Sequence, residues 1–119
     1  MLWVVCEHAE TGSILLRLIK AKGYEVEVLD CGQELRKRAQ FQTPDLIIVD
    51  CGVPESFLMI REIRSRRHAR SPAVIMFSRD EQNMLEQALA HGADSYVPKG
   101  SLDWAELLAE IEKFARPAH

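Results

Sequence analysis

Four polar residues of the sequence carry groups that can together bind a divalent cation and a phosphoryl group: Glu7, Asp50, Ser78 and Lys99. Carboxylate oxygens suit Mg²⁺, which prefers hard oxygen ligands. A hydroxyl and an ammonium group donate hydrogen bonds to phosphoryl oxygens. An Asp carboxylate is also a competent nucleophile toward phosphorus and gives an acyl phosphate. Asp50 is therefore the candidate reacting group of this chain.

Each of these residues lies at or just after the end of a predicted strand. Apolar runs at 2–5, 46–49 and 73–77, rich in β-branched residues, are typical of strands buried on both faces of a sheet. Residues 24–29 alternate between polar and apolar side chains, which indicates a strand nearer an edge. Residues 95–97 form a brief last strand.

Helical periodicity separates these strands. Gly23 is placed to end the first helix, while Asp80 and Ser101 are placed to cap the fourth and the last. Each helix has apolar residues at a spacing that places them on one face, which is expected to point inward. In the first helix these are Ile14, Leu15, Leu18 and Ile19, in a helix over 34–40 they are Leu35 and Ala39, and in a helix over about 57–66 they are Ile60 and Ile63. In the fourth helix they are Met84, Leu85, Ala88 and Leu89, and in the last they are Leu107, Leu108, Ile111 and Phe114.

Strict alternation of strand and helix predicts parallel strands with right-handed crossovers and helices on both faces of the sheet. Five such units are too few for an eight-fold barrel. The fold expected for residues 1–119 is thus a single doubly wound, flavodoxin-like (βα)5 domain with strand order 2-1-3-4-5. In that order the strand ends carrying Cys6, Glu7, Asp50, Ser78 and Lys99 converge on one cleft, where ligands bind in open α/β sheets.

Composition excludes several classes of function. A formal net charge of -3 does not draw the whole molecule to a phosphate backbone, and the basic run from Arg61 to Arg70 is expected to be a solvated helix face. Apolar runs fall far short of the roughly 20 residues that cross a bilayer. Three cysteines with no export signal at the amino terminus indicate reduced, mostly buried thiols in a cytosol. We therefore expect a cytoplasmic protein without direct nucleic-acid or membrane contacts.

With these residues in this order, the sequence resembles the receiver domain of bacterial two-component response regulators over essentially all 119 residues. The resemblance rests on the stretch 44–50 with Val53 and Pro54 after it, on 73–78 and on 88–99. Their order and spacing together are specific, although no single piece is.

The resemblance implies a role for each residue of the cleft. Asp50 would accept a phosphoryl group from a sensor histidine kinase or a phosphotransfer protein, and Ser78 and Lys99 would hold that group. Tyr96 would change rotamer. Weakly bound Mg²⁺ would take oxygens of Glu7, Asp50 and the Gly52 carbonyl. The chain would be a phosphoacceptor rather than an enzyme, at most catalysing its own phosphotransfer and dephosphorylation.

The same resemblance implies an output surface. Movement of Ser78 and Tyr96 would alter a face formed by the helix from Met84 to Leu89, the strand of Tyr96 and the last helix, with Trp104 at its edge. A downstream protein or a second copy of the chain would dock there, so a homodimer is one expected partner.

The sequence departs from the family pattern at the site itself. Cys6 stands where a second acidic residue is usual, which predicts weaker Mg²⁺ binding because a thiol is a poor ligand for a hard cation. Arg79 replaces a small residue and either closes the pocket or binds the phosphoryl group. Gly100 stands in place of a common proline, so the peptide bond before it is expected to be trans.

These departures leave alternative functions open. One is a pseudo-receiver that interacts with proteins independently of phosphate. Another is a flavodoxin-like binder of a nucleotide or flavin, although residues 8–12 lack the glycines of a phosphate loop. A redox or soft-metal site formed by Cys6, Cys31 and Cys51 is geometrically conceivable, but no CxxC spacing supports it and buried structural thiols are favoured.

Overall fold

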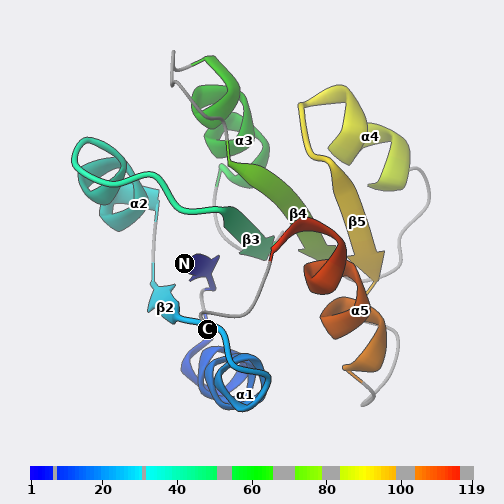
Figure 1. The fold of residues 1–119 in the computed structure, drawn as a ribbon. Helices are drawn as coiled ribbons and strands as arrows, with labels where there is room; N and C mark the ends of the chain where they lie inside the picture. The colour runs from blue at the N-terminus through cyan, green and yellow to red at the C-terminus, as the bar shows by residue number, and fades with distance from the viewer. Residues whose placement is uncertain are drawn as a thin grey trace.

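Five strands alternate with five helices along the chain, as predicted (Figure 1). The structure is a computed structural model that describes residues 1–6, 8–30, 32–50, 55–65, 72–78, 84–98 and 104–115. In chain order the elements are β1 (Leu2–Val5), α1 (Ala9–Ala21), β2 (Val26–Leu29), α2 (Gly32–Ala39), β3 (Leu46–Asp50), α3 (Ser56–Ser65), β4 (Ala73–Ser78), α4 (Met84–Ala90), β5 (Ser95–Pro98) and α5 (Ala105–Phe114).

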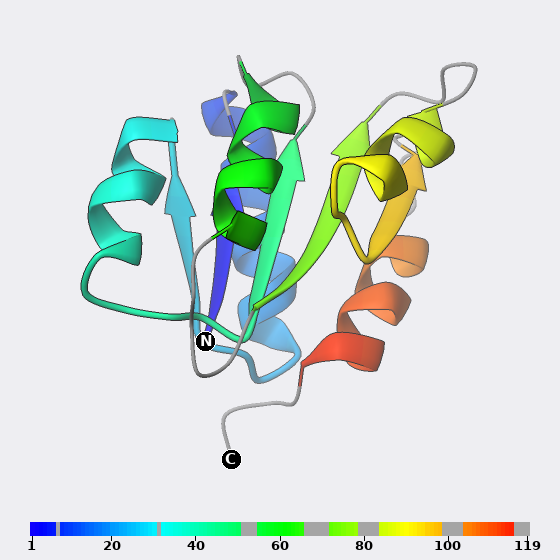
Figure 2. The same ribbon diagram turned by 90° about the horizontal axis from the view of Figure 1, so that it is seen from above.

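All strands are parallel and form one sheet in the order β2-β1-β3-β4-β5, which confirms the predicted topology. Their arrows point the same way in Figure 2, so their carboxyl ends share one edge of the sheet. Val5 of β1 pairs with Val49 of β3, and Asp50 pairs with Phe77 of β4. This register brings the end of β3 between the ends of β1 and β4.

Helices cover both faces of the sheet, with α1 and α5 on one face and α2, α3 and α4 on the other (Figures 1 and 2). Side chains alternate between these two layers along each strand. In β1, Leu2 and Val4 pack with α1 and α5, while Trp3 and Val5 pack with the opposite helices. All four are fully buried, which explains why β1 is apolar throughout rather than alternating.

Two glycines end helices where the chain needs a left-handed backbone. Gly23 follows α1 with φ 93°, and its N–H donates to the Lys20 carbonyl at 2.9 Å, as expected for this predicted helix end. Gly92 follows α4 with φ 111°. A Cβ on Gly92 would lie 2.7 Å from Cγ of Arg64, so this turn also needs glycine for space.

Two of the predicted inward faces are partly wrong. Ile14 of α1 is 42% exposed, because Leu15 and Ile19 point at the sheet and Ile14 is rotated away from them. In α4, Ala88 is fully buried while Leu85 and Leu89 are 51% and 48% exposed. The small Ala88 lets α4 approach the sheet closely, and its larger neighbours flank that contact on the outside.

The predicted cap of the last helix is also wrong. The helix α5 begins at Ala105 with Trp104 at its N-cap position, not at Ser101. Ser101 and Asp80 lie outside the described residues. The inward face is confirmed, with Leu107 and Ile111 buried and Leu108 and Phe114 partly buried. Among the helices in the described ranges, none has the length and apolar character to cross a membrane.

Candidate functional site

Asp50 is the last residue of β3 and only 2% of it is exposed. The fully buried run before it places it there, because β3 lies between β1 and β4 and is covered by helices on both faces. By strand alternation it follows Ile48, on the face of α1 and α5. A buried carboxylate at the carboxyl edge of a parallel sheet is a strong candidate for a functional group, since burying a charge has a cost.

Cys6 directly contacts this carboxylate. Its Sγ lies 3.5 Å from Oδ2 of Asp50 and 3.4 Å from the carbonyl oxygen of His8. Cys6 follows β1 and is only 3% exposed. The prediction that Cys6 lies at the cleft beside Asp50 agrees with this contact. Sequence reasoning missed the hydrogen bond itself, although adjacent strand ends in the order 2-1-3 are the signal that could have indicated it.

The backbone of Ser78 lies at the same edge of the sheet. Ser78 is the last residue of β4, follows the partner of Asp50 in the ladder, and pairs with Pro98 of β5. The structure therefore brings together the strand ends of Cys6, Asp50 and Ser78. Other residues expected at or near the site lie outside the described residues: Glu7, Cys31, Cys51, Gly52, Arg79, Lys99 and Gly100.

Tyr96 lies on the middle of β5, paired with Met76. It is partly buried and packs against the core cluster on the face of α2, α3 and α4. This agrees with its prediction as a half-buried strand aromatic. Because β5 pairs with β4 and contacts α4, Tyr96 lies beside the surface predicted to carry the output.

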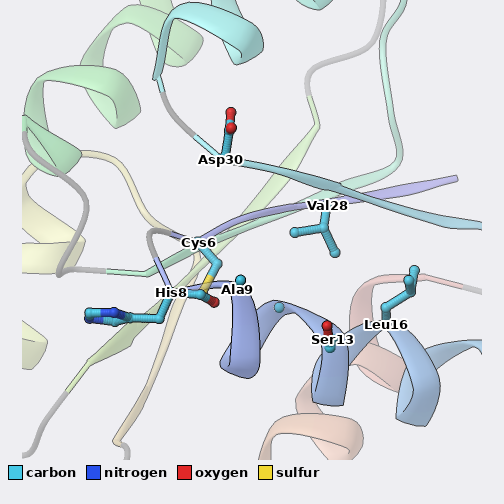
Figure 3. A pocket seen from close by; sticks show the side chains of 8 residues that line it. Cys6, His8, Ala9, Ser13, Leu16, Val28 and Asp30 are labelled. Carbon is cyan, nitrogen blue, oxygen red and sulfur yellow. The ribbon is translucent and has the colours of Figure 1, made fainter.

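A hollow of about 380 Å³ adjoins Cys6 on the side away from β3. Figure 3 shows Val28 of β2 and Leu16 of α1 facing one another across it, with Cys6 at one end and His8 turned away. Gly12 on α1 lies close to β2 here, since a Cβ on it would be 3.0 Å from Cγ1 of Val28. Asp50 does not line the hollow, so the hollow lies next to the candidate site but does not contain the Asp50 carboxylate.

In the described part of the site, one side chain is suited to binding Mg²⁺. The Asp50 carboxylate supplies the hard oxygen that Mg²⁺ prefers, whereas the Cys6 sulfur does not. Within the described ranges, no three His, Cys, Asp or Glu side chains lie close enough together to hold a metal ion. A Mg²⁺ site therefore needs further oxygens, and the sequence predicts them at Glu7 and Gly52.

The fold, the buried strand-end carboxylate and the sequence together define the class of this protein. Residues 2–112 match the response regulator receiver domain family, and the chain belongs to that family. It is a receiver domain of the kind that response regulators use in two-component signalling. Receiver domains are generally signalling domains rather than enzymes.

Several relatives in sequence are named transcriptional regulatory proteins. The chain is 35% identical over 118 residues to the phosphate regulon transcriptional regulatory protein PhoB of Rhizobium meliloti, covering 96% of this chain and 52% of that protein. It is 27% identical to the transcriptional regulatory protein CreB of Escherichia coli, covering 98% of this chain and 54% of that one. The chain thus spans about half the length of these relatives.

Solved structures share the fold. The receiver domain of the TMAO respiratory system response regulator TorR aligns with a TM-score of 0.82 at 27% identity, over 94% of this chain and 92% of that one. The chemotaxis response regulator CheY4 of Vibrio cholerae aligns with a TM-score of 0.85 at 20% identity, over 96% and 97%. The response regulator TrrA of Thermotoga maritima, solved in complex with Mg²⁺ and BeF, aligns with a TM-score of 0.82 at 24% identity, over 96% and 97%.

Proposed function

We propose that the chain is switched by phosphorylation of Asp50 within a two-component phosphorelay. The observation that carries this proposal is the position of Asp50. It is a buried carboxylate at the carboxyl end of the central strand, in a chain that belongs to the receiver family. A sensor histidine kinase or a phosphotransfer protein is the proposed donor.

The proposed reaction transfers a phosphoryl group from a histidine imidazole to the Asp50 carboxylate. An oxygen of the Asp50 carboxylate attacks the phosphorus of a phosphohistidine, and an O–P bond forms as the P–N bond breaks. The imidazole leaves and takes up a proton. The product is an acyl phosphate that brings about two negative charges into the cleft. The Ser78 hydroxyl and the Lys99 ammonium are the proposed groups that compensate this charge, and Arg79 is a further cation next in sequence to Ser78.

Mg²⁺ is the proposed cofactor, held by Glu7, Asp50 and the carbonyl of Gly52. When bound, it would neutralise charge on the phosphoryl oxygens. The complex of TrrA with Mg²⁺ and BeF supports the assignment by its fold. The thiol of Cys6, 3.5 Å from Oδ2 of Asp50, supports the expectation that binding is weak.

The proposed output surface combines α4, β5 and α5. Leu85 and Leu89 are large apolar side chains left half-exposed on α4, and Tyr96 lies partly buried on the adjoining strand. Movement of Ser78 toward a phosphoryl group would free space for Tyr96 to turn inward and reshape this surface. A downstream protein or a second copy of the chain is the proposed occupant.

A stable phosphoryl mimic tests the proposal. Beryllofluoride with Mg²⁺ should raise the thermal unfolding midpoint of the native chain, since a ligand at a hundred times its Kd stabilises the folded state by about 2.7 kcal/mol. Asp50→Asn keeps the shape of the side chain but removes the charge, and its midpoint should not move. Equal shifts in both proteins would show that the mimic binds elsewhere.

A further inference from the structure

Asp50 has a thiol as its direct neighbour at the carboxyl edge of the sheet. The Sγ of Cys6 lies 3.5 Å from Oδ2 of Asp50, and both residues are at most 3% exposed. A cysteine sulfur is a nucleophile toward activated carbonyl carbons. On the basis of the proposed function, which supplies the acyl phosphate, we propose that Cys6 attacks the phosphorylated Asp50 side chain. The attack forms a thioester between the two residues and releases inorganic phosphate, so Cys6 ends the phosphorylated state from within the chain.

The two side chains lie on neighbouring strand ends that such a link can join. β1 and β3 pair in parallel with Val5 opposite Val49, so the next residues in register are Cys6 and Asp50. Neighbouring strands lie about 4.7–4.9 Å apart. A disulfide joins residues whose Cα atoms are about 4.4–6.8 Å apart, and a Cβ–S–C–Cβ thioester link has as many bonds as a Cβ–S–S–Cβ disulfide link. The observed register therefore permits the link.

The sulfur lies beside the carboxyl carbon that it would attack. This carbon is one bond of about 1.2 Å from Oδ2, which places it at most about 4.7 Å from Sγ. A turn about the Cβ–Cγ bond of Asp50 presents the face of the carbon to the sulfur. Because both groups belong to one folded chain, the step is intramolecular and needs no encounter with a second molecule.

Phosphorylation is what makes the carboxyl carbon reactive. In the resting state the S–H of Cys6 has two acceptors within reach, Oδ2 of Asp50 and the His8 carbonyl at 3.4 Å, and a free carboxylate resists attack by a thiol. In the acyl phosphate, the S–C bond forms as the C–O bond to the phosphoryl group breaks. The phosphate leaves with the electron pair of that bond and takes up the thiol proton. The products are the thioester and hydrogen phosphate.

Water then returns the chain to its resting state. Attack of water on the thioester carbon breaks the S–C bond and restores the Asp50 carboxylate and the Cys6 thiol. Since both residues are almost fully buried, the access of water to the link is restricted. We therefore expect the thioester to accumulate to a measurable level before it is hydrolysed.

Intact mass and a thiol count together test the inference. The probe is acetyl phosphate with Mg²⁺, added to the native chain. A phosphoryl adduct should be followed by a species that is lighter than the native chain by one water molecule. After denaturation this species should have two titratable thiols in place of three, and hydroxylamine should release the third. A lighter species that keeps three thiols, such as a succinimide between Asp50 and the backbone of Cys51, would overturn the inference.

Two matched variants identify the sulfur. Cys6→Ser should gain the phosphoryl group, lose it more slowly than the native chain, and form no lighter species. Cys51→Ser removes the thiol next in sequence to Asp50 and should still form it. A lighter species that persists in Cys6→Ser, or that requires Cys51, would contradict the inference. If Cys6→Ser does not fold by circular dichroism, the mass and thiol count of the native chain still decide.

The same experiment separates this inference from the proposed function. A native chain that gains a phosphoryl group, keeps three thiols and forms no lighter species would retain phosphorylation and overturn the thioester. If neither the native chain nor Cys6→Ser gained a phosphoryl group, both would be overturned, because no acyl phosphate would form.

Discussion

The ring of Trp104, just before α5, packs against the ring of Phe77 near the end of β4, with 5.5 Å between the ring centroids and a tilt of 41°. Phe77 pairs with Asp50 in the ladder and precedes Ser78. The contact therefore joins the strand end beside the proposed phosphorylation site to the first turn of the last helix. A shift of β4 at Ser78 would reach Trp104 through one side chain.

Trp104 fluorescence should therefore report on the state of Asp50. Beryllofluoride with Mg²⁺ should change the emission of the native chain, because the proposed movement at Ser78 would shift the ring of Phe77. The only other tryptophan, Trp3, is fully buried in the opposite layer. In Trp104→Phe the spectrum should no longer respond. A response that survives this substitution would contradict the coupling.

Arg64 of α3 should stabilise the fold through its hydrogen bonds. It donates from Nε to the Gly92 carbonyl at 2.6 Å and from Nη1 to the Pro72 carbonyl at 2.8 Å, and it pairs with Asp94. A lysine ammonium cannot reproduce these contacts of the planar guanidinium group, so Arg64→Lys should lower the free energy of unfolding by roughly 1–3 kcal/mol in urea titrations. Arg61→Lys, an exposed position on the same helix, should change it by no more than about 0.5 kcal/mol. If the two substitutions lowered the free energy of unfolding equally, the guanidinium contacts of Arg64 would not be stabilising.

Glu110 should make stability depend on pH. Hydrogen bonds from Lys113 and then from Ser95, each at 2.7 Å, hold the pKa of this carboxyl below its usual value. A lowered pKa in the folded state stabilises the fold above the unfolded pKa of roughly 4.3, and the effect is lost as the pH falls through the folded value.

Ser95→Ala tests this dependence. Near neutral pH it should lower the free energy of unfolding by roughly 0.5–1 kcal/mol, since the group is partly solvated. The difference from the native chain should shrink in urea titrations below about pH 4, near the usual pKa of a glutamate. A difference that stays constant or grows in acid would contradict the pKa assignment.

The output surface should change its binding when Asp50 changes state. Partner binding or self-association should differ with and without beryllofluoride, because only a difference in affinity between two states shifts their equilibrium. Ser78→Ala and Tyr96→Ala should each abolish that difference. Binding that is equal in both states of the native chain would assign a constitutive interaction to this face.

Sequence patterns were sufficient for the architecture because each signal was local. Continuous apolar runs identified β1, β3 and β4 as buried strands, and the alternation of elements then limited the topology through known crossover rules. The errors arose where tertiary packing determines which side chains of a helix face the sheet. Nothing in the periodicity of α4 shows that Ala88 makes the close contact with the sheet while Leu85 remains outside.

The site was predictable in part for the same reason. That Asp50 ends a buried strand is readable from residues 46–49. The contact of Cys6 with Oδ2 of Asp50 depends on how two side chains turn at neighbouring strand ends, which the sequence does not encode locally. The packing of Phe77 on Trp104 joins residues far apart in the chain and carries no periodic signal.

The mass of the intact chain tests the central claim most directly. Incubated with Mg²⁺ and a small phosphodonor such as acetyl phosphate, the native chain should gain the mass of one phosphoryl group. Asp50→Asn should gain none under the same conditions, and Cys6→Asp should gain it faster because its Mg²⁺ site is more complete. A native chain that gains no phosphoryl group, or an Asp50→Asn variant that gains one, would contradict the assignment of Asp50 as the phosphoacceptor.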